Sequence, residues 1–170
     1  MLIELCPDWI LVAAGKTTER HKLLYEAGLI CQAPPLLNFL HAAKLFYEGQ
    51  HWKRAAECYL QVQLSGNAGM CFEKCNEFAR ATNAYYCAGL AKEFARICFS
   101  QDLYTRCLEG LDDLNHGEAK SLQSSESLPD LQEECIKRGA VFHTLRGSDD
   151  EMMFFVTRFA EITKERAFFP

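Results

Sequence analysis

A Gly-Lys-Thr triplet at positions 15–17 is the first pattern in the chain that could carry chemistry, because such a triplet ends the phosphate-binding loop of nucleotide-hydrolysing enzymes. That loop reads GxxxxGK[ST], and its first glycine would fall at Ile10. Without this glycine the backbone amides do not readily surround a phosphate. No downstream apolar strand ending in Asp is evident to hold magnesium. We therefore favour a helix start with Thr17 or Thr18 as the N-cap.

Cys71 and Cys75 form a second such pattern, since two closely spaced thiols resemble half of a metal site. His51 or His116 would be the partners. The two cysteines lie four residues apart on a predicted helix, however, and no second CxxC or HxxxH pair completes a tetrahedral set. No Cys–His or Ser–His–Asp set stands out by sequence proximity either. We predict buried free thiols, no metal or other cofactor, and no catalytic residue.

The cysteine count and the N-terminus both concern the compartment of the protein. Nine cysteines, an odd number at irregular spacing, do not suggest a disulfide framework. The apolar N-terminus carries Glu4 and Asp8 with no basic residue before them, unlike a secretory signal. No uncharged run approaches the about 20 residues that a membrane helix needs. We expect an intracellular protein, cytoplasmic or nuclear, with no membrane partner and reduced thiols.

The charge of the chain bears on nucleic-acid binding. Its net charge is −5 and its pI is near 5.6. Binding DNA or RNA through phosphates requires clustered Lys and Arg. The basic residues are scattered here, and Lys53-Arg54 and Lys137-Arg138 are the only adjacent pairs. We expect no direct contact with nucleic acid.

The spacing of apolar residues is helical almost throughout and predicts an all-α fold. Pro34-Pro35 is expected to open a helix that Gly49 stops as a C-cap. Asn67 is a plausible N-cap for the segment after it, and further short helices are expected to end at Gly89 and near Ser100. The predicted apolar stripes are Leu37, Leu40, Leu45 and Tyr47 in the first helix, and Trp52, Ala55, Ala56, Tyr59 and Leu60 in the second.

The C-terminal third is predicted to be a helical hairpin. Residues 115–129 are polar and Ser-rich, as in a loop or linker. A helix is expected to start at Pro129-Asp130, and Ser148 with Glu151 resembles a capping box for a last helix. The apolar stripe of that helix is Met152, Phe155, Val156, Phe159 and Ile162.

An internal echo links residues 43–59 to 69–85, at a shift of 26 positions. A further shift of 16 repeats the tetrapeptide EFAR, from 77–80 to 93–96. Bulky aromatics followed by alanines suit short antiparallel helix pairs, which cover their apolar faces by stacking. We favour a degenerate repeat over a non-repetitive bundle whose aromatics coincide. The pairs matched at 26 are Phe46 with Phe72, Trp52 with Phe78, Arg54 with Arg80, Ala55 with Ala81, and Tyr59 with Tyr85.

Together these patterns predict short antiparallel helix pairs stacked as a TPR-like α-solenoid. The expected divisions are an N-terminal segment over 1–33, degenerate helical repeats over 34–114, the polar linker over 115–129, and a C-terminal helical hairpin over 130–170. In the aromatic pairs Tyr85-Tyr86 and Phe154-Phe155 we expect one core residue and one rim residue. An exposed member of a pair would be a candidate contact with a partner.

The run RAAECYLQVQLSGNAGMCFEKCNEFARATNAYYCAGLAKEFARICF and its continuation to residue 114 resemble a known helical repeat region. It is that of the TPR and ankyrin repeat-containing proteins, and most of all of their plant relatives, the UvrD-like helicase proteins. The resemblance spans about residues 52–169. It includes the MM-x-FV-x-x-F pattern at Met152, Met153, Phe155, Val156 and Phe159.

In that family a superfamily 1 helicase-like ATPase core precedes the repeats. No Walker A or magnesium motif of such a core is present here, so the resemblance implies a fragment that carries only the repeat region. We expect protein–protein interaction or scaffolding, with protein partners or neighbouring domains and no small-molecule substrate. The alternatives are a helicase-related activity retained only in the full-length protein, and a trafficking-coat-type solenoid.

Overall fold

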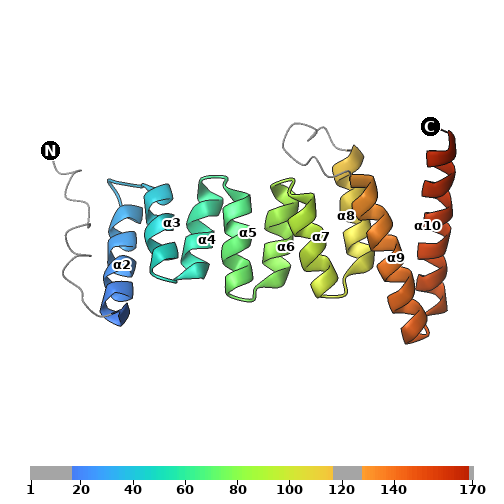
Figure 1. The fold of residues 1–170 in the computed structure, drawn as a ribbon. Helices are drawn as coiled ribbons and strands as arrows, with labels where there is room; N and C mark the ends of the chain where they lie inside the picture. Colours follow the sequence, from blue (N-terminus) through green and yellow to red (C-terminus); the bar gives the residue numbers. More distant parts are fainter. Residues whose placement is uncertain (1–16, 117–127, 169–170) are drawn as a thin grey trace. The chain divides into compact units, whose positions relative to one another are not determined.

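The computed structural model describes residues 17–116 and 128–168, and the regular elements in these two ranges are all α-helices (Figure 1). The all-α prediction is therefore confirmed for the part of the chain that is described. The helices are α2 (Thr17–Gln32), α3 (Phe39–Glu48), α4 (Trp52–Gln61), α5 (Ser65–Lys74), α6 (Phe78–Cys87), α7 (Ala91–Ser100), α8 (Tyr104–His116), α9 (Leu128–Arg146) and α10 (Asp149–Phe168).

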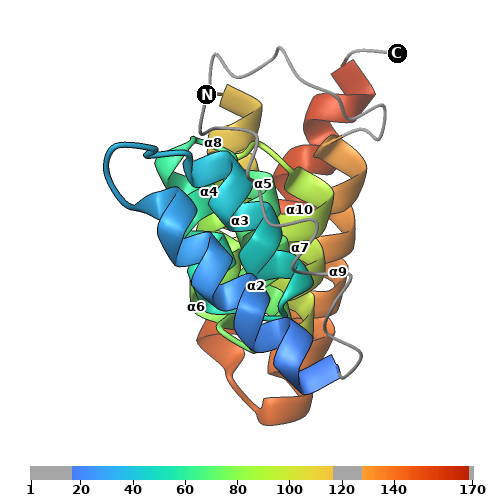
Figure 2. The same cartoon turned by 90° about the vertical axis from the view of Figure 1, so that its left-hand side faces the viewer.

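Internal contacts divide the chain into two compact units, Met1–Ala84 and Tyr85–Pro170. In the first unit α2 packs on α3, α3 on α4 and α4 on α5. In the second unit α7 packs on α8, α8 on α9 and α9 on α10, and α7 also contacts α9. Figures 1 and 2 both show α2 lying beside α3, and α9 beside α10. Within the described ranges no helix is both long and apolar enough to cross a bilayer.

The helix starts follow a regular spacing along the chain. Each helix from α3 to α7 has ten residues and is followed by three connecting residues. The 26-residue echo in the sequence therefore corresponds to two helix–turn units of 13 residues each. The helices from α3 to α8 begin at Phe39, Trp52, Ser65, Phe78, Ala91 and Tyr104.

A left-handed residue in each connection ends the helix before it. After α4, Gln63 has φ 58° and donates its N–H to the carbonyl of Leu60 at 3.0 Å. Leu64 then donates to the carbonyl of Tyr59 at 2.9 Å. These two bonds form a Schellman motif, which satisfies the last carbonyls of a helix. The same motif follows α3, α5, α6, α7 and α9, with its left-handed residue at Gln50, Asn76, Gly89, Asp102 and Gly147.

Burial follows the same spacing. In each of the helices α3, α4, α5, α7 and α8, the fourth, fifth, seventh and eighth residues are buried. Two adjacent turns of the helix supply these positions, so they make one continuous face. The residues at these positions are Ala42, Ala43, Leu45 and Phe46 in α3, Ala55, Ala56, Cys58 and Tyr59 in α4, Ala68, Gly69, Cys71 and Phe72 in α5, Phe94, Ala95, Ile97 and Cys98 in α7, and Cys107, Leu108, Gly110 and Leu111 in α8.

The second echo in the sequence, EFAR at 77–80 and 93–96, does not match equivalent places. Phe78 is the first residue of α6 and is partly exposed, whereas Phe94 is the fourth residue of α7 and is buried. The 16-residue shift is therefore a coincidence of letters, because helix positions recur every 13 residues.

The expected start of the helix after Pro34-Pro35 is wrong. It begins at Phe39, where the side chain of Asn38 accepts a bond from the His41 N–H at 3.0 Å. Because Leu37 precedes the helix and both Leu37 and Leu40 are exposed, the predicted stripe also fails at these positions. Gly49 is the C-cap, as predicted, but the left-handed residue is the next one, Gln50.

Two more details of the helices differ from expectation. Asn67 is not an N-cap, since it lies inside α5, which starts two residues earlier. In α4, Leu60 is exposed, although the rest of the predicted stripe is buried or partly buried. The segment 1–33, for which no structure was predicted, contains α2.

The C-terminal hairpin consists of α9 and α10, and Ser148 directly precedes α10 as the predicted cap. The Ser148 carbonyl accepts the Met152 N–H at 3.0 Å. In the predicted stripe Phe155 is fully buried, but Val156 is 46% exposed. Helix α8 reaches His116 and α9 begins at Leu128, so both ends of the expected linker 115–129 are helical and its middle lies outside the described residues.

Changing Gln63 to Gly should raise the free energy of unfolding by about 1 kcal/mol, because an L-residue pays roughly 1–2 kcal/mol in the left-handed region and glycine does not. The matched control is Gln61→Gly, two residues earlier and inside α4, which should lower the free energy of unfolding by up to about 1 kcal/mol. Urea unfolding followed by circular dichroism measures both. Destabilisation of equal size in the two variants would contradict the role of Gln63.

Candidate functional site

The nucleotide pattern and the metal pattern of the sequence are placed differently by the structure. Gly15 and Lys16 lie outside the described residues, and Thr17 is the first residue of α2. Cys71 is buried in α5, and its burial raises the pKa of its thiol to about 11. Such a thiol stays protonated at neutral pH, whereas a metal ligand must be a thiolate. His51 lies instead against the Tyr25 ring, with 4.7 Å between ring centroids.

A metal site does not form elsewhere in the described ranges either, where no three His, Cys, Asp or Glu side chains are placed to share an ion. The cysteines described are free, as predicted, and most of them are buried. Three of them meet inside the second unit, where the Cys107 thiol is hydrogen-bonded to Cys135 and Cys98. These bonds, together with burial, raise the pKa of Cys107 far above its ordinary value. The thiols are thus part of the core.

A groove on the second unit, between α7 and α9, is the candidate functional site. Its volume is about 480 Å³ and it is open along one side. Basic side chains from both helices surround a strip of apolar ones. The lining residues are Lys92, Ala95, Arg96, Phe99, Ser100, Leu131, Glu134 and Arg138.

Arg138 is held at the edge of this groove by two contacts. Its guanidinium donates to the Glu134 carboxylate at 2.6 Å, one helical turn away in α9. It also lies over the Phe99 ring, 4.8 Å from the ring centroid, across the groove in α7. A cation over an aromatic face is attracted by the ring quadrupole. The charge of Arg138 is therefore positioned by both walls of the groove.

An aromatic cluster beneath the groove fixes the distance between its walls. Phe99 of α7 stacks on Tyr104 of α8, with 6.0 Å between centroids and 28° between planes. Tyr104 in turn contacts Phe142 of α9 at 5.2 Å. Aromatic pairs at such separations are favourable beyond the area that they bury. The three rings connect α7 to α9 through α8.

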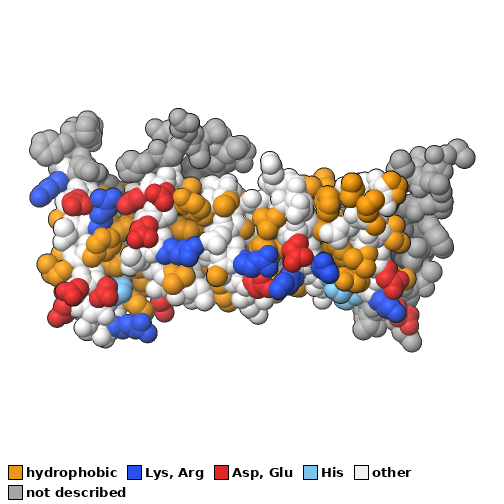
Figure 3. All heavy atoms as spheres, turned by 180° about the vertical axis from the view of Figure 1, so that it is seen from behind, with side chains coloured by type: hydrophobic (Ala, Val, Ile, Leu, Met, Phe, Trp, Pro, Cys, Tyr) orange, Lys and Arg blue, Asp and Glu red, His pale blue; other side chains and the backbone are white. Residues whose placement is uncertain are grey.

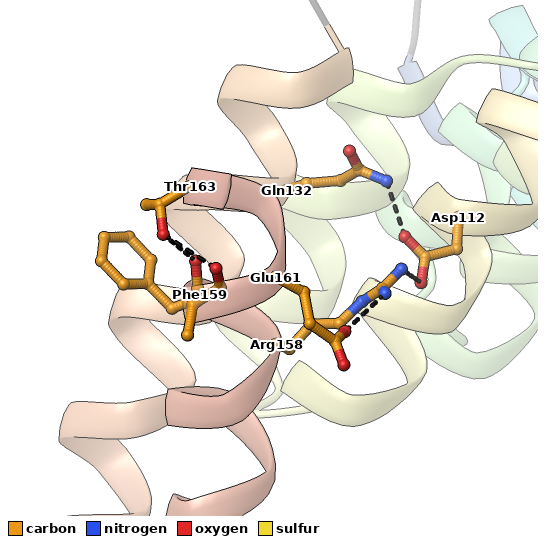
Figure 4. A network of polar contacts seen from close by, with 7 residues as sticks. Asp112, Gln132, Arg158, Phe159, Glu161 and Thr163 are labelled. Atoms are coloured by element: carbon orange, nitrogen blue, oxygen red, sulfur yellow. Dashed lines mark hydrogen bonds and ion pairs between the residues drawn. The ribbon is translucent and has the colours of Figure 1, made fainter. Parts of the chain in front are cut away.

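A polar network attaches α9 and α10 to α8 on another part of the second unit (Figure 4). Asp112 of α8 accepts a bond from the Gln132 amide at 2.7 Å and an ion pair from Arg158 at 2.8 Å. Arg158 also pairs with Glu161 in its own helix at 3.0 Å. These bonds, with Glu161 as the largest cause, raise the pKa of Arg158. The network is structural, because each polar group in it has a partner in the protein.

The aromatic pairs of the sequence divide as expected between core and rim. Tyr85 and Phe155 are buried, whereas Tyr86 is 36% and Phe154 46% exposed. Tyr86 is not free, because its hydroxyl donates to Asp113 at 3.3 Å. Phe154 remains a candidate contact residue on α10.

Charges in the first unit, by contrast, are largely matched at the places that the structure describes. Lys53 and Arg80 both bind the carboxylate of Glu77, each at 2.8 Å. Lys53, and then Arg80, lower the pKa of Glu77. On the face in Figure 3 basic and acidic side chains are intermixed, and hydrophobic ones gather over α2 and α3.

The sequence showed the groove residues without showing the groove. Arg138 belongs to one of the two adjacent basic pairs, and Arg96 ends the second EFAR tetrapeptide. The signal that would join them is the helix spacing, since Lys92 and Arg96 are four residues apart on α7, and Leu131, Glu134 and Arg138 share one side of α9.

Replacing Asp112 by Asn should lower the free energy of unfolding of the second unit by about 1–3 kcal/mol, because it removes a partly buried ion pair and leaves Arg158 without its partner from α8. Glu161→Gln is the control, since Glu161 is exposed and pairs within α10. Its effect should stay within about 0.5 kcal/mol. Urea unfolding measures both variants, and equal effects would contradict a tie between α8 and α10.

Comparison with known proteins does not identify the chain. No protein-family model matches it, and neither the curated proteins nor the solved structures contain a significant match.

Proposed function

We propose that the chain is a TPR-like α-solenoid for protein–protein interaction or scaffolding, with no catalysis of its own. The observation that carries this proposal is the α7–α9 groove, in which charged and aromatic side chains converge on an open apolar strip. Sites that bind proteins combine exposed apolar or aromatic residues with a polar rim. Its walls are regular helices, which position side chains more rigidly than loops do.

The helix arrangement within each unit supports the solenoid part of this proposal. Each helix packs on the one after it, and the same four positions are buried in helix after helix. Repeat proteins are built in this way, with every unit contacting its neighbours and presenting a continuous surface. The unit of 13 residues per helix is shorter than the half of a regular tetratricopeptide repeat, whose full length is about 34 residues.

The resemblance to the TPR and ankyrin repeat-containing proteins supports the wider context. On that basis we propose that the chain is the accessory repeat region of a superfamily 1 helicase-like protein and acts inside the cell. Its partners would be other proteins or neighbouring domains. The intermixed charges on the described surface agree with a role that does not depend on nucleic acid.

A photo-cross-linking residue placed at Val141 should capture the same protein partner in independent preparations from intact cells. Val141 is 60% exposed on α9, next to the groove. The control position is Glu109, which is exposed on α8 and does not line the groove. Mass spectrometry of the cross-linked bands identifies the partner. If Val141 and Glu109 capture the same set of proteins, or Val141 captures none, the groove is not a protein-binding site.

The purified chain should give no binding heat when it is titrated with Mg-ATP. The reason is that Ile10 stands where a phosphate-binding loop needs its first glycine. Lys16→Ala should leave the thermogram unchanged. A saturable heat that Lys16→Ala abolishes would show a nucleotide site and overturn the non-catalytic assignment.

A further inference from the structure

The α7–α9 groove has a charge opposite to that of the chain as a whole. Three basic residues, Lys92, Arg96 and Arg138, line it against the single carboxylate of Glu134, a local charge of +2 in a protein of net charge −5. Lys92 and Arg96 are exposed and one helical turn apart on α7. Clefts lined by one sign of charge concentrate the field and attract ligands of the other sign. The groove therefore favours an anionic group.

The strip between these charges is apolar. Ala95 is buried at its base, and Phe99 and Leu131 are partly exposed beside it. An anion such as free phosphate has no use for this surface, because burying apolar area favours a ligand that is itself partly apolar. The ligand must present both carboxylates and hydrocarbon.

The exposed side of α9 continues this apolar strip beyond the groove. Val141 and Leu145 are 60% and 84% exposed. They follow Arg138 by three and seven residues, so they lie on the same side of the helix. Helices α7 and α9 run in the same direction, and α9 extends past the end of α7 (Figure 1). A charged groove thus passes into an apolar ledge on a single helix.

We infer that this surface binds a short acidic peptide segment whose carboxylates are followed by apolar side chains, and the inference rests on the protein-binding role proposed above. The carboxylates pair with Lys92, Arg96 and Arg138, and the apolar side chains cover Val141 and Leu145. Charge complementarity orients such a segment, while the apolar contacts slow its dissociation.

The spacing within the segment follows from the helix. Arg138 and Leu145 are separated by about 10 Å along α9, at a rise of about 1.5 Å per residue. An extended peptide covers that distance in about three residues. The expected segment therefore has two or three acidic residues, then about three residues, then a leucine-sized side chain.

A nucleic-acid strand fits this surface less well than a peptide does. Glu134 places a carboxylate within the groove, where it repels a phosphate backbone. The ledge of Val141 and Leu145 is aliphatic, whereas single strands bind through aromatic side chains on which bases stack. The net charge of −5 adds repulsion.

The test is fluorescence anisotropy with a fluorescein-labelled peptide, EDEDSGSLSL, and the intact chain at about 0.15 M salt. Arg96→Glu should weaken binding by about tenfold or more, as charge reversal does in steered complexes. Lys92→Glu should act likewise, and it is safe for the fold because an acidic residue is favourable in the first turn of α7. Glu134→Gln should tighten binding by about twofold to threefold, since it removes the opposing carboxylate.

Controls separate this inference from non-specific attraction. Arg54→Glu, an exposed charge reversal in the first unit, should leave the affinity unchanged. Replacing both leucines of the peptide by serine should weaken binding, and so should raising the salt. The inference is overturned if the peptide does not bind, if Arg54→Glu acts as Arg96→Glu does, or if a fluorescein-labelled 20-nucleotide DNA strand binds more tightly at the same groove. A partner cross-linked at Val141 together with any of these results would leave the proposed function standing and remove only the acidic peptide.

Discussion

A left-handed residue ends each helix from α3 to α7, and the place of that residue determines where the next helix starts. The Schellman motif around it satisfies the last carbonyls of one helix and reverses the chain within three residues. Since each helix has ten residues, the chain returns to an equivalent position every 13 residues. The buried positions depend on this spacing: a helix one residue longer would turn its buried face by about 100° away from its neighbour.

Such short connections require the helices to approach closely, which explains the small residues in the core. Three glycines lie directly under aromatic rings, and a Cβ on any of them would overlap the ring. The closest approaches of such a Cβ are 2.6 Å at Gly28 to Phe46, 2.5 Å at Gly110 to Phe94 and 2.7 Å at Gly139 to Phe155. Alanine and cysteine fill the neighbouring positions for the same reason, since both are small and tolerate complete burial. The cysteines at Cys58, Cys71, Cys98 and Cys107 are thus explained by packing.

The sequence alone predicts the helical class, the cap at Gly49, the cap at Ser148 and the 26-residue relationship. It does not show the shorter unit of 13, because Gln50, Gln63, Asn76 and Asp102 adopt the left-handed conformation where glycine would have been the signal. Asn67 was misread for the converse reason: a residue that favours caps lies inside a helix. The groove was not predictable from proximity in the chain, because Arg96 and Arg138 come from helices separated by the whole of α8 and the segment after it.

The site arises where the regular spacing stops. Helix α7 keeps ten residues, but α9 has 19, so a large part of α9 extends beyond the helix beside it. A helix with no neighbour along part of its length leaves side chains uncovered, and on α9 these are Val141 and Leu145. The same change of length places Arg138 opposite Phe99 at the end of α7. A regular array of ten-residue helices would have covered both features. We conclude that the binding surface is a consequence of the irregular helix, held in position by the regular ones.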